Sequence, residues 1–266
     1  MDTMTLLNRQ NNLAIITIFL MSLTSFSIFS SSSHAQSDNA HSNNAQPKST
    51  SAHLPFFSAE YEALIQGFPV SAKREYKPLT STISELSFSA TSMLASLKET
   101  SQFAWQQQQI KPIRFTHERK VLGQSRRQTL SFDWSSNQIT STTKGETNII
   151  NNPQEALDHL SFQLQLQHDL SANKIEDNIY RIADKKRIKE YSFKVIGEER
   201  IETQLGALNT TKVMVVRDND DRVTYIWLAR DWNNLLARLE QYEEKSKKFS
   251  IQVTSAVIAG KKVSGL

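Results

Sequence analysis

The chain has 266 residues, a formal net charge of +4, an isoelectric point near 9.2 and no cysteine. The missing thiols exclude disulfide scaffolds, cysteine nucleophiles, cysteine zinc sites, iron–sulfur clusters and the lipid anchor of a lipoprotein. With 38% hydrophobic residues and few glycines or prolines, the composition is that of a globular domain and excludes collagen-like chains. No cofactor is indicated, and the mild positive charge favours peripheral contact with anionic surfaces such as membrane lipids without requiring nucleic acid.

The first 35 residues have the pattern of a secretion signal. Arg9 precedes the uncharged apolar run Leu13–Leu23, which has the length of a signal-peptide core and is short for a membrane span. Ser33 and Ala35 supply the small residues that a signal peptidase reads, so we expect cleavage after Ala35 and a periplasmic protein. Retention of this segment as an anchor is the alternative. Residues 36–53 are polar enough to predict a disordered linker, and the remaining domain is residues 54–266.

From Phe57 onward, apolar and polar residues alternate, as in strands with one buried face. The turns between these strands are predicted at Gln66–Pro69, Gly197–Glu198, Leu205–Gly206 and 218–221. One-sided alternation with short turns is typical of antiparallel meanders. We therefore predict a mainly β fold with a single large, strongly curved antiparallel sheet or an open barrel-like meander. The expected strands are 57–65, 70–76, 86–90, 103–105, 113–115, 130–134, 139 onward, 180–183, 191–195, 212–217, 223–228, 235–242 and 249–257.

One central segment favours a helix over residues 153–170. Asn152 is a candidate helix cap, Pro153 suits the first helical position, and Glu155 completes a capping pattern. The same segment also alternates like a strand from Leu160 to Leu166. On a helix its apolar residues form two nearly opposite stripes, so the helix would be covered on two sides and would plug or cap the curved sheet.

Four motifs occur in order along the domain: Pro112-Ile113-Arg114-Phe115, Asp158-His159-Leu160-Ser161, the run Tyr191–Glu199 and the run Ile226–Asp231. By the order and spacing of these motifs, the chain resembles the bacterial periplasmic family catalogued as domain of unknown function 3108 (DUF3108), over roughly residues 57–251. The chain departs from the family pattern at Arg230, where proline is usual, and at Leu236-Ala237-Arg238, where a Leu-Pro is usual. The resemblance implies an exported β-rich domain and no assigned activity.

Catalytic motifs are scarce, so we expect no enzyme. No nucleophile elbow, phosphate-binding glycine loop or His-Glu-x-x-His motif occurs. His117, His159 and His168 are expected to be structural. Asp231 and the pair Glu198-Glu199 are carboxylates near strand ends, and a hydrolase acting on envelope polysaccharide is one alternative.

The preferred hypothesis is a non-catalytic binding or carrier module, in which a curved sheet holds an apolar or anionic envelope ligand such as a lipid or a polypeptide. A structural or assembly partner of an envelope complex is the second alternative. An outer-membrane barrel is disfavoured, because the charged run Lys185–Lys189 suits a lipid-facing wall badly. The predicted ligand-binding residues are aromatic and equally suited to a core: Tyr61, Trp105, Phe115, Trp134 and Trp227.

Overall fold

The computed structural model describes residues 53–65, 68–151, 153–172, 174, 179–216 and 222–265. The predicted signal peptide, the linker up to residue 52, Asn152 and the predicted turn at 218–221 lie outside these residues. In the described part, no helix combines the length and the apolar character needed to cross a membrane.

The predicted antiparallel sheet is confirmed. The described residues form one sheet whose strand order is β8-β7-β6-β5-β4-β3-β2-β1-β14-β13-β12-β11-β10-β9, with β15 paired to β14. Strands that are consecutive in the chain are therefore sheet neighbours, except β8 and β9, which lie at the two ends of the sheet. The pairing of β1 with β14 joins the two halves of the chain. The strands are β1 (Phe57–Ile65), β2 (Phe68–Pro78), β3 (Ile83–Thr91), β4 (Ala95–Gln106), β5 (Gln109–Val121), β6 (Gln124–Asp133), β7 (Gln138–Thr143), β8 (Glu146–Asn151), β9 (Ile179–Asp184), β10 (Arg187–Thr203), β11 (Gly206–Val216), β12 (Arg222–Ala229), β13 (Leu235–Glu243), β14 (Ser246–Ile258) and β15 (Lys261–Lys262), with a short 3-10 helix η2 (Arg230–Trp232) between β12 and β13.

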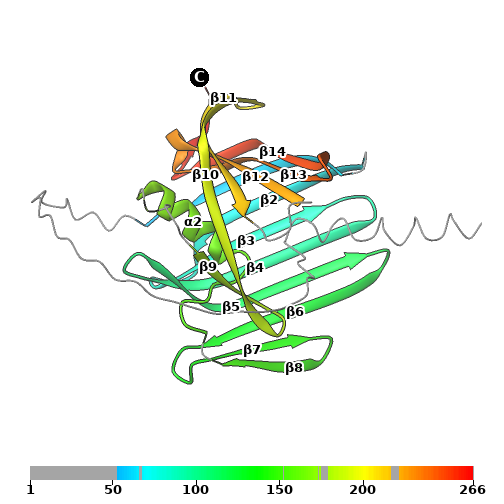
Figure 1. Cartoon of the computed structure of the whole chain (residues 1–266), viewed down its shortest axis with the longest axis vertical. Helices are drawn as coiled ribbons and strands as arrows, with labels where there is room; N and C mark the ends of the chain where they lie inside the picture. Colours follow the sequence, from blue (N-terminus) through cyan, green and yellow to red (C-terminus); the bar gives the residue numbers. More distant parts are fainter. Residues whose placement is uncertain are drawn as a thin grey trace, which may run out of the picture. The chain divides into compact units, whose positions relative to one another are not determined.

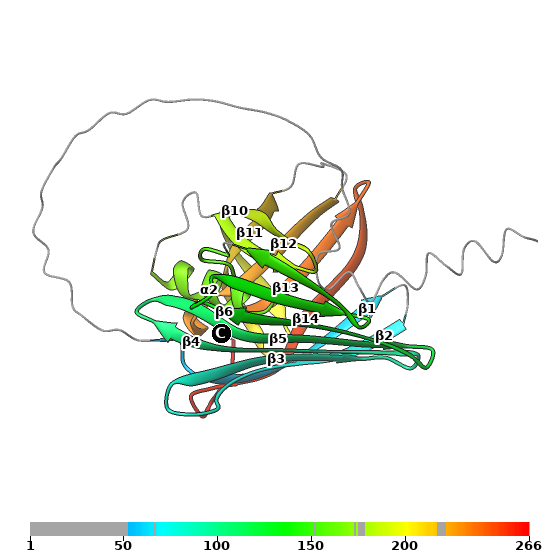
Figure 2. The same cartoon turned by 90° about the horizontal axis from the view of Figure 1, so that it is seen from below.

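The sheet curls, so that its β9–β10 end returns over β4 and β5 with the helix α2 (Ser161–Ser171) between them (Figures 1 and 2). On one side of the helix, Gln165 accepts a hydrogen bond from the backbone N–H of Ile110 in β5, at 2.8 Å. On the other side, Phe162 stacks on Tyr191 and Phe193 of β10, with ring centroids 6.4 and 5.9 Å apart. A helix buried on both sides fills the curl, which explains why its sequence carries two apolar stripes.

The helix begins eight residues later than the predicted start at Pro153. The sheet uses the preceding backbone, because Leu157 forms a parallel bridge with Ile182 of β9. The Asp158 carboxylate then accepts hydrogen bonds from the N–H groups of Leu160 and Ser161, both at 2.9 Å, which satisfies donors of the first helical turn. Tertiary pairing therefore overrides the local capping pattern at Asn152 and Pro153.

Strand β10 contains a bend where we predicted a turn, so the predicted turn at Gly197–Glu198 is wrong. The strand runs through to Thr203, and its register against β11 shifts between Val195 and Gly197. A φ of +153° at Gly197 is strained for other residues, so glycine permits this bulge. Beyond the bend, the Glu202 carbonyl accepts hydrogen bonds from Arg238 and Gln252 on the outer face of β13 and β14. One strand thus covers the inner face with its first half and the outer face with its second.

Candidate functional site

Pairing between strands places a row of large side chains across the buried inner face of the sheet. Arg74 of β2 lies opposite Phe88 of β3, Phe88 opposite Glu99 of β4, Glu99 opposite His117 of β5, and His117 opposite Gln128 of β6. We call these five residues the inner row. The adjacent row on the same face is mostly core and contains Tyr76, Leu86, Ser101, Phe115 and Leu130. Charged and amide groups of the inner row therefore lie inside an otherwise apolar face.

Several polar atoms of the inner row are buried without a hydrogen-bond partner. Arg74 is only 3% exposed, and its Nε and Nη2 atoms make no hydrogen bond. The same is true of the Glu99 Oε2 and Gln128 Nε2 atoms, and of the Ser141 hydroxyl on the same face of β7. Each unsatisfied buried polar group lowers the free energy of unfolding by about 1–3 kcal/mol. Core packing alone therefore does not explain why these groups are present.

Glu99 and His117 form a buried carboxylate–imidazole pair. The His117 Nδ1 atom lies 2.6 Å from Glu99 Oε1, and Glu99 is 1% exposed. This contact fixes the orientation of the ring and leaves the second carboxylate oxygen toward the interior without a partner. His117 retains partial exposure of its side chain, so the pair lies at the border between core and solvent.

Beside Arg74, the inner face is built from small residues around one tyrosine. Tyr61 of β1 is 1% exposed, and its hydroxyl makes no hydrogen bond of standard geometry. Burial raises the pKa of Tyr61, while the charge of the nearby Arg74 guanidinium and a looser hydrogen-bond contact with it oppose that rise. Phe88 lies directly opposite Arg74 on β3 and Val253 directly opposite Tyr61 on β14, while four other nearby inward positions are alanines: Ala59, Ala72, Ala90 and Ala256.

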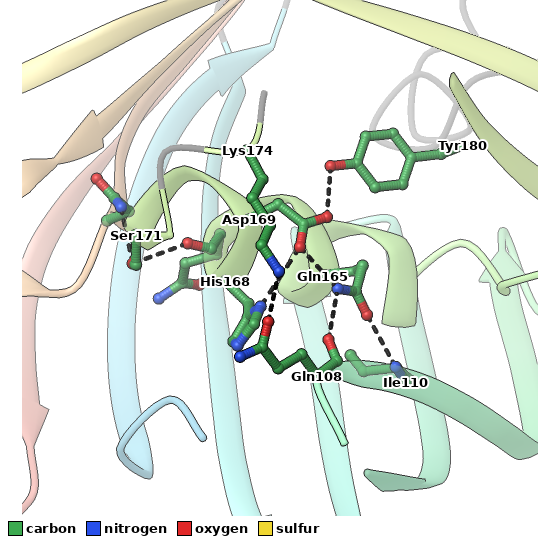
Figure 3. Close-up of polar contacts among 10 residues, drawn as sticks. Gln108, Ile110, Gln165, His168, Asp169, Ser171, Lys174 and Tyr180 are labelled. Atoms are coloured by element: carbon green, nitrogen blue, oxygen red, sulfur yellow. Dashed lines mark hydrogen bonds and ion pairs between the residues drawn. The ribbon is translucent and has the colours of Figure 1, made fainter. Parts of the chain in front are cut away.

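At the opposite end of the inner face, a network of hydrogen bonds connects α2 to the sheet (Figure 3). The Gln165 amide donates to the Gln108 carbonyl at 3.0 Å and to Asp169 at 2.9 Å, while its oxygen binds the Ile110 N–H. The Tyr180 hydroxyl of β9 donates to the other oxygen of Asp169, at 2.9 Å. This network, which we call the helix latch, joins β5, α2 and β9. A pocket of about 280 Å³ adjoins it, and its lining includes Lys111, Glu155 and Arg181.

Two further carboxylates, the buried Asp158 and the partly buried Asp184, also have polar partners. Asp158 accepts a hydrogen bond from the Ser101 hydroxyl at 2.6 Å as well as the two backbone bonds that start the helix. Burial raises the pKa of Asp158 even so. Burial also acts to raise the pKa of Asp184, but His159 and Lys189 outweigh it and hold that pKa well below its ordinary value. The Lys189 Nζ atom lies 2.7 Å from the Asp184 carboxylate.

The structure does not bring the five predicted aromatic residues together. Tyr61 and Phe115 face the interior, Phe115 against the His159 ring. Trp105 donates to the Tyr76 hydroxyl near the end of the helix, and Trp134 donates to the Pro112 carbonyl beyond β6. Trp227 lies on the outer face, bonded to Glu199 and covered by Lys212 and Arg238.

The carboxylates considered for catalysis each have a polar partner. Asp231 accepts a hydrogen bond from Asn209, Glu198 pairs with Arg230, and Glu199 accepts from the Trp227 indole. That indole hydrogen bond lowers the pKa of Glu199, which favours an ionised group rather than a general acid. No cluster of three or more His, Asp or Glu side chains suited to a metal ion occurs in the described part of the chain.

Sequence reasoning missed the polar members of the inner row, although the sequence contains a signal for them. Arg74 has the same alternation parity as Val70, Ala72 and Tyr76, and therefore had to point inward. Glu99 likewise falls between the inward residues of β4. A charged residue at an inward position of a strand is the observation that would have identified both.

Three solved structures resemble the chain at low identity. A β-barrel-like protein of domain of unknown function DUF1849 from Brucella abortus is 11% identical with a TM-score of 0.48, covering 80% of this chain and 98% of that one. A candidate lipoprotein from Parabacteroides distasonis is 11% identical with a TM-score of 0.31, covering 77% and 96%. A candidate exported protein with a YmcC-like fold from Bacteroides fragilis is 11% identical with a TM-score of 0.29, covering 77% and 100%.

No curated protein matches the chain. The family model described as "Protein of unknown function (DUF3108)" matches residues 70–250, which is more than half of the chain. This match confirms the resemblance noted in the sequence: the chain belongs to the DUF3108 family.

Proposed function

We propose that this protein is an exported, non-catalytic binding or carrier module whose curled sheet holds an amphipathic envelope ligand, such as a lipid, on its inner face. The proposed location depends on the apolar N-terminal run and the Ala35 cleavage signal. The observation that carries the binding role is the inner row, where Arg74, Glu99 and Gln128 keep polar atoms without partners inside an apolar face.

Stability alone gives no reason to keep these groups. Replacing buried polar groups by apolar groups of similar size is often neutral or stabilising. Unpartnered polar atoms in a native protein therefore call for an explanation such as a bound molecule. A small number of placed polar groups in a mostly apolar surface is the usual composition of a small-molecule site.

The inner face of β11, β12 and β13 also supports a ligand role. Ile226 of β12 and Leu239 of β13 are cross-strand neighbours on the inner face and retain partial solvent exposure. Val213 of β11 is the next residue along that row and is fully buried. The apolar inner face is therefore buried at Val213 but partly open to solvent at Ile226 and Leu239. An exposed apolar surface of this kind is where an apolar chain would bind.

Native mass spectrometry of protein purified from the envelope without detergent tests the proposal. We expect a defined fraction with the added mass of one amphiphile, and displacement of a fluorescent fatty acid by the extracted material. A protein that carries no added mass and binds neither fatty acids nor phospholipids would rule the carrier role out.

An assembly role is the second candidate, because β8 ends the sheet with an unpaired edge in the described residues. Ile149 of this strand is 48% exposed, and exposed edges are templates for strand addition by a partner. Photo-crosslinking from position 147, which is exposed on the same side of β8, should then trap one defined protein in intact cells. Substituting Ile149→Lys should abolish that crosslink while leaving the thermal stability of the chain unchanged.

A further inference from the structure

We infer that Arg74 and Tyr61 form an oxyanion anchor that binds the carboxylate or phosphate head of a single-chain amphiphile. This inference rests on the proposed carrier function and specifies its ligand class. Arg74 is the inner-row residue with two unpartnered donor atoms on one planar edge, and Tyr61 lies beside it on the neighbouring strand β1.

The free atoms of Arg74 have the geometry of one ligand class. Nε and Nη2 form one edge of the planar guanidinium, so their N–H groups point the same way in parallel. Two parallel donors match two oxygens on one carbon or phosphorus atom, which is the bidentate arrangement typical of arginine with carboxylates and phosphates. Both atoms are buried and unpartnered. The Tyr61 hydroxyl oxygen faces the same guanidinium, and its O–H, which has no acceptor within the described residues, is a third donor.

The charge of Arg74 is not balanced by the protein. Arginine stays protonated in proteins, so burial cannot neutralise it as it could a lysine. Among the described residues, Arg74 takes part in no salt bridge; its guanidinium lies over the Phe57 ring, 5.8 Å from the centroid, and near the neutral Tyr61 hydroxyl. Glu99, in the same row, is separated from Arg74 by Phe88 and is paired with His117. An anion from outside the chain would supply the missing partner.

The surroundings specify an amphiphile rather than a free inorganic ion. The inward positions around the anchor are apolar or aromatic: Ala59 and Ala72 are cross-strand neighbours of Arg74 and Tyr61, and Phe57 and Tyr76 follow along the strands. Phe88 separates the anchor from the carboxylate of Glu99, which would repel an anion placed nearer to it. A headgroup at Arg74 would thus have apolar surface next to it for the first methylene groups of a chain.

Binding titrations on the purified protein test the anchor with four probes. Oleate and oleoyl lysophosphatidate carry an oxyanion head, oleyl alcohol carries the same chain without a charge, and acetate carries the head without the chain. We expect the two anionic amphiphiles to bind at least 10-fold more tightly than oleyl alcohol, and acetate to bind undetectably. The ratio between oleate and lysophosphatidate then shows whether the site prefers carboxylate or phosphate.

Variants separate an anchoring role from a structural one. Arg74→Met should weaken oleate binding by about 10- to 100-fold, the loss expected for charge-assisted hydrogen bonds, and leave oleyl alcohol binding unchanged. Tyr61→Phe should weaken oleate binding by a smaller factor. Arg114→Gln on the exposed part of β5 is the matched control and should change neither. Melting of ligand-free Arg74→Met should occur at the same temperature as the wild type or higher, because an unpaired buried charge is removed.

Each outcome decides a different question. Equal affinities for oleate and oleyl alcohol in the wild type, or an Arg74→Met variant that binds oleate normally, would overturn the anchor while the carrier function stands. Failure of every amphiphile to bind would overturn both. If Arg74→Met melts at a lower temperature without ligand, Arg74 is a structural residue, and the anchor is refuted.

Discussion

The helix latch and the inner row lie on the same buried face of one sheet, yet they treat polar groups in opposite ways. At the latch, Gln165 uses its amide oxygen and nitrogen for three hydrogen bonds. In the inner row, Gln128 is as deeply buried, at 8% exposure against 7%, and its Nε2 atom has no partner. The contrast distinguishes buried polar groups whose hydrogen bonds stabilise the fold from buried polar groups that make no such bond.

The largest effect in this comparison is expected at Asp158, which accepts two hydrogen bonds from the helix start and one from Ser101 of β4. Asp158→Ala should lower the free energy of unfolding by about 2–4 kcal/mol, because it leaves buried N–H donors and the Ser101 hydroxyl unpartnered. Chemical denaturation measures this change. Asp158→Asn is the control, and since it keeps acceptor and size and removes a charge that burial disfavours, its cost should be below about 1 kcal/mol. Equal losses in both variants would show that the charge itself is needed.

Gln165→Leu should cost about 2–3 kcal/mol, because the Ile110 N–H and the Gln108 carbonyl lose their partner in a buried place. The matched change in the inner row, Gln128→Leu, removes an amide whose nitrogen is already unpartnered. We expect that variant to be within about 0.5 kcal/mol of the wild type or more stable. Urea denaturation of both variants compares the two regions directly. A Gln128→Leu variant as unstable as Gln165→Leu would erase the distinction between them.

The contribution of Asp184 to the free energy of unfolding is expected to depend on pH. Because its pKa is held below the ordinary value, its contribution is complete above about pH 4 and is lost as the pH falls through the depressed pKa. Asp184→Asn should therefore lower the free energy of unfolding by about 1–3 kcal/mol at pH 7, and the difference from the wild type should narrow in acid. Denaturation at pH 7, 4 and 3 measures this trend. A difference that is constant across the three pH values would show that Asp184 acts through packing rather than charge.

The smallest effect is expected on the exposed surface of β2. Lys77 pairs with Glu75 and Glu85 at 3.4 and 3.7 Å, and its side chain is 45% exposed. Lys77→Ala should change the free energy of unfolding by less than about 0.5 kcal/mol, because water and salt screen such pairs. A thermal melt with and without 0.5 M salt checks this. A larger loss would mean that charge pairs on the outer face matter as much as the buried network.

Local pattern was sufficient to place most strands but not to give their full lengths: residues 103–105 and 113–115 were predicted where β4 covers Ala95–Gln106 and β5 covers Gln109–Val121. It was also insufficient for the helix start and the bend in β10. Alternation along β1 and β14 identified their inward residues, since a strand has only two sides. At Pro153 the capping signal favoured a helix, but the backbone of Leu157 gained more from pairing with β9, some 25 residues away. At Gly197 a glycine suggested a turn, and contacts of Glu202 with β13 and β14 instead continue the strand.

By itself, the sequence determined the class of the fold, the absence of thiol chemistry, the family, and which side of each strand faces inward, because those properties depend on composition and on neighbours within one strand. The tertiary structure alone decided that Arg74, Phe88, Glu99, His117 and Gln128 share one row, and that donor groups of Arg74 and Tyr61 are left without acceptors in the described residues. Register between strands and the curl of the sheet set those relations, and both depend on packing between residues far apart in the chain.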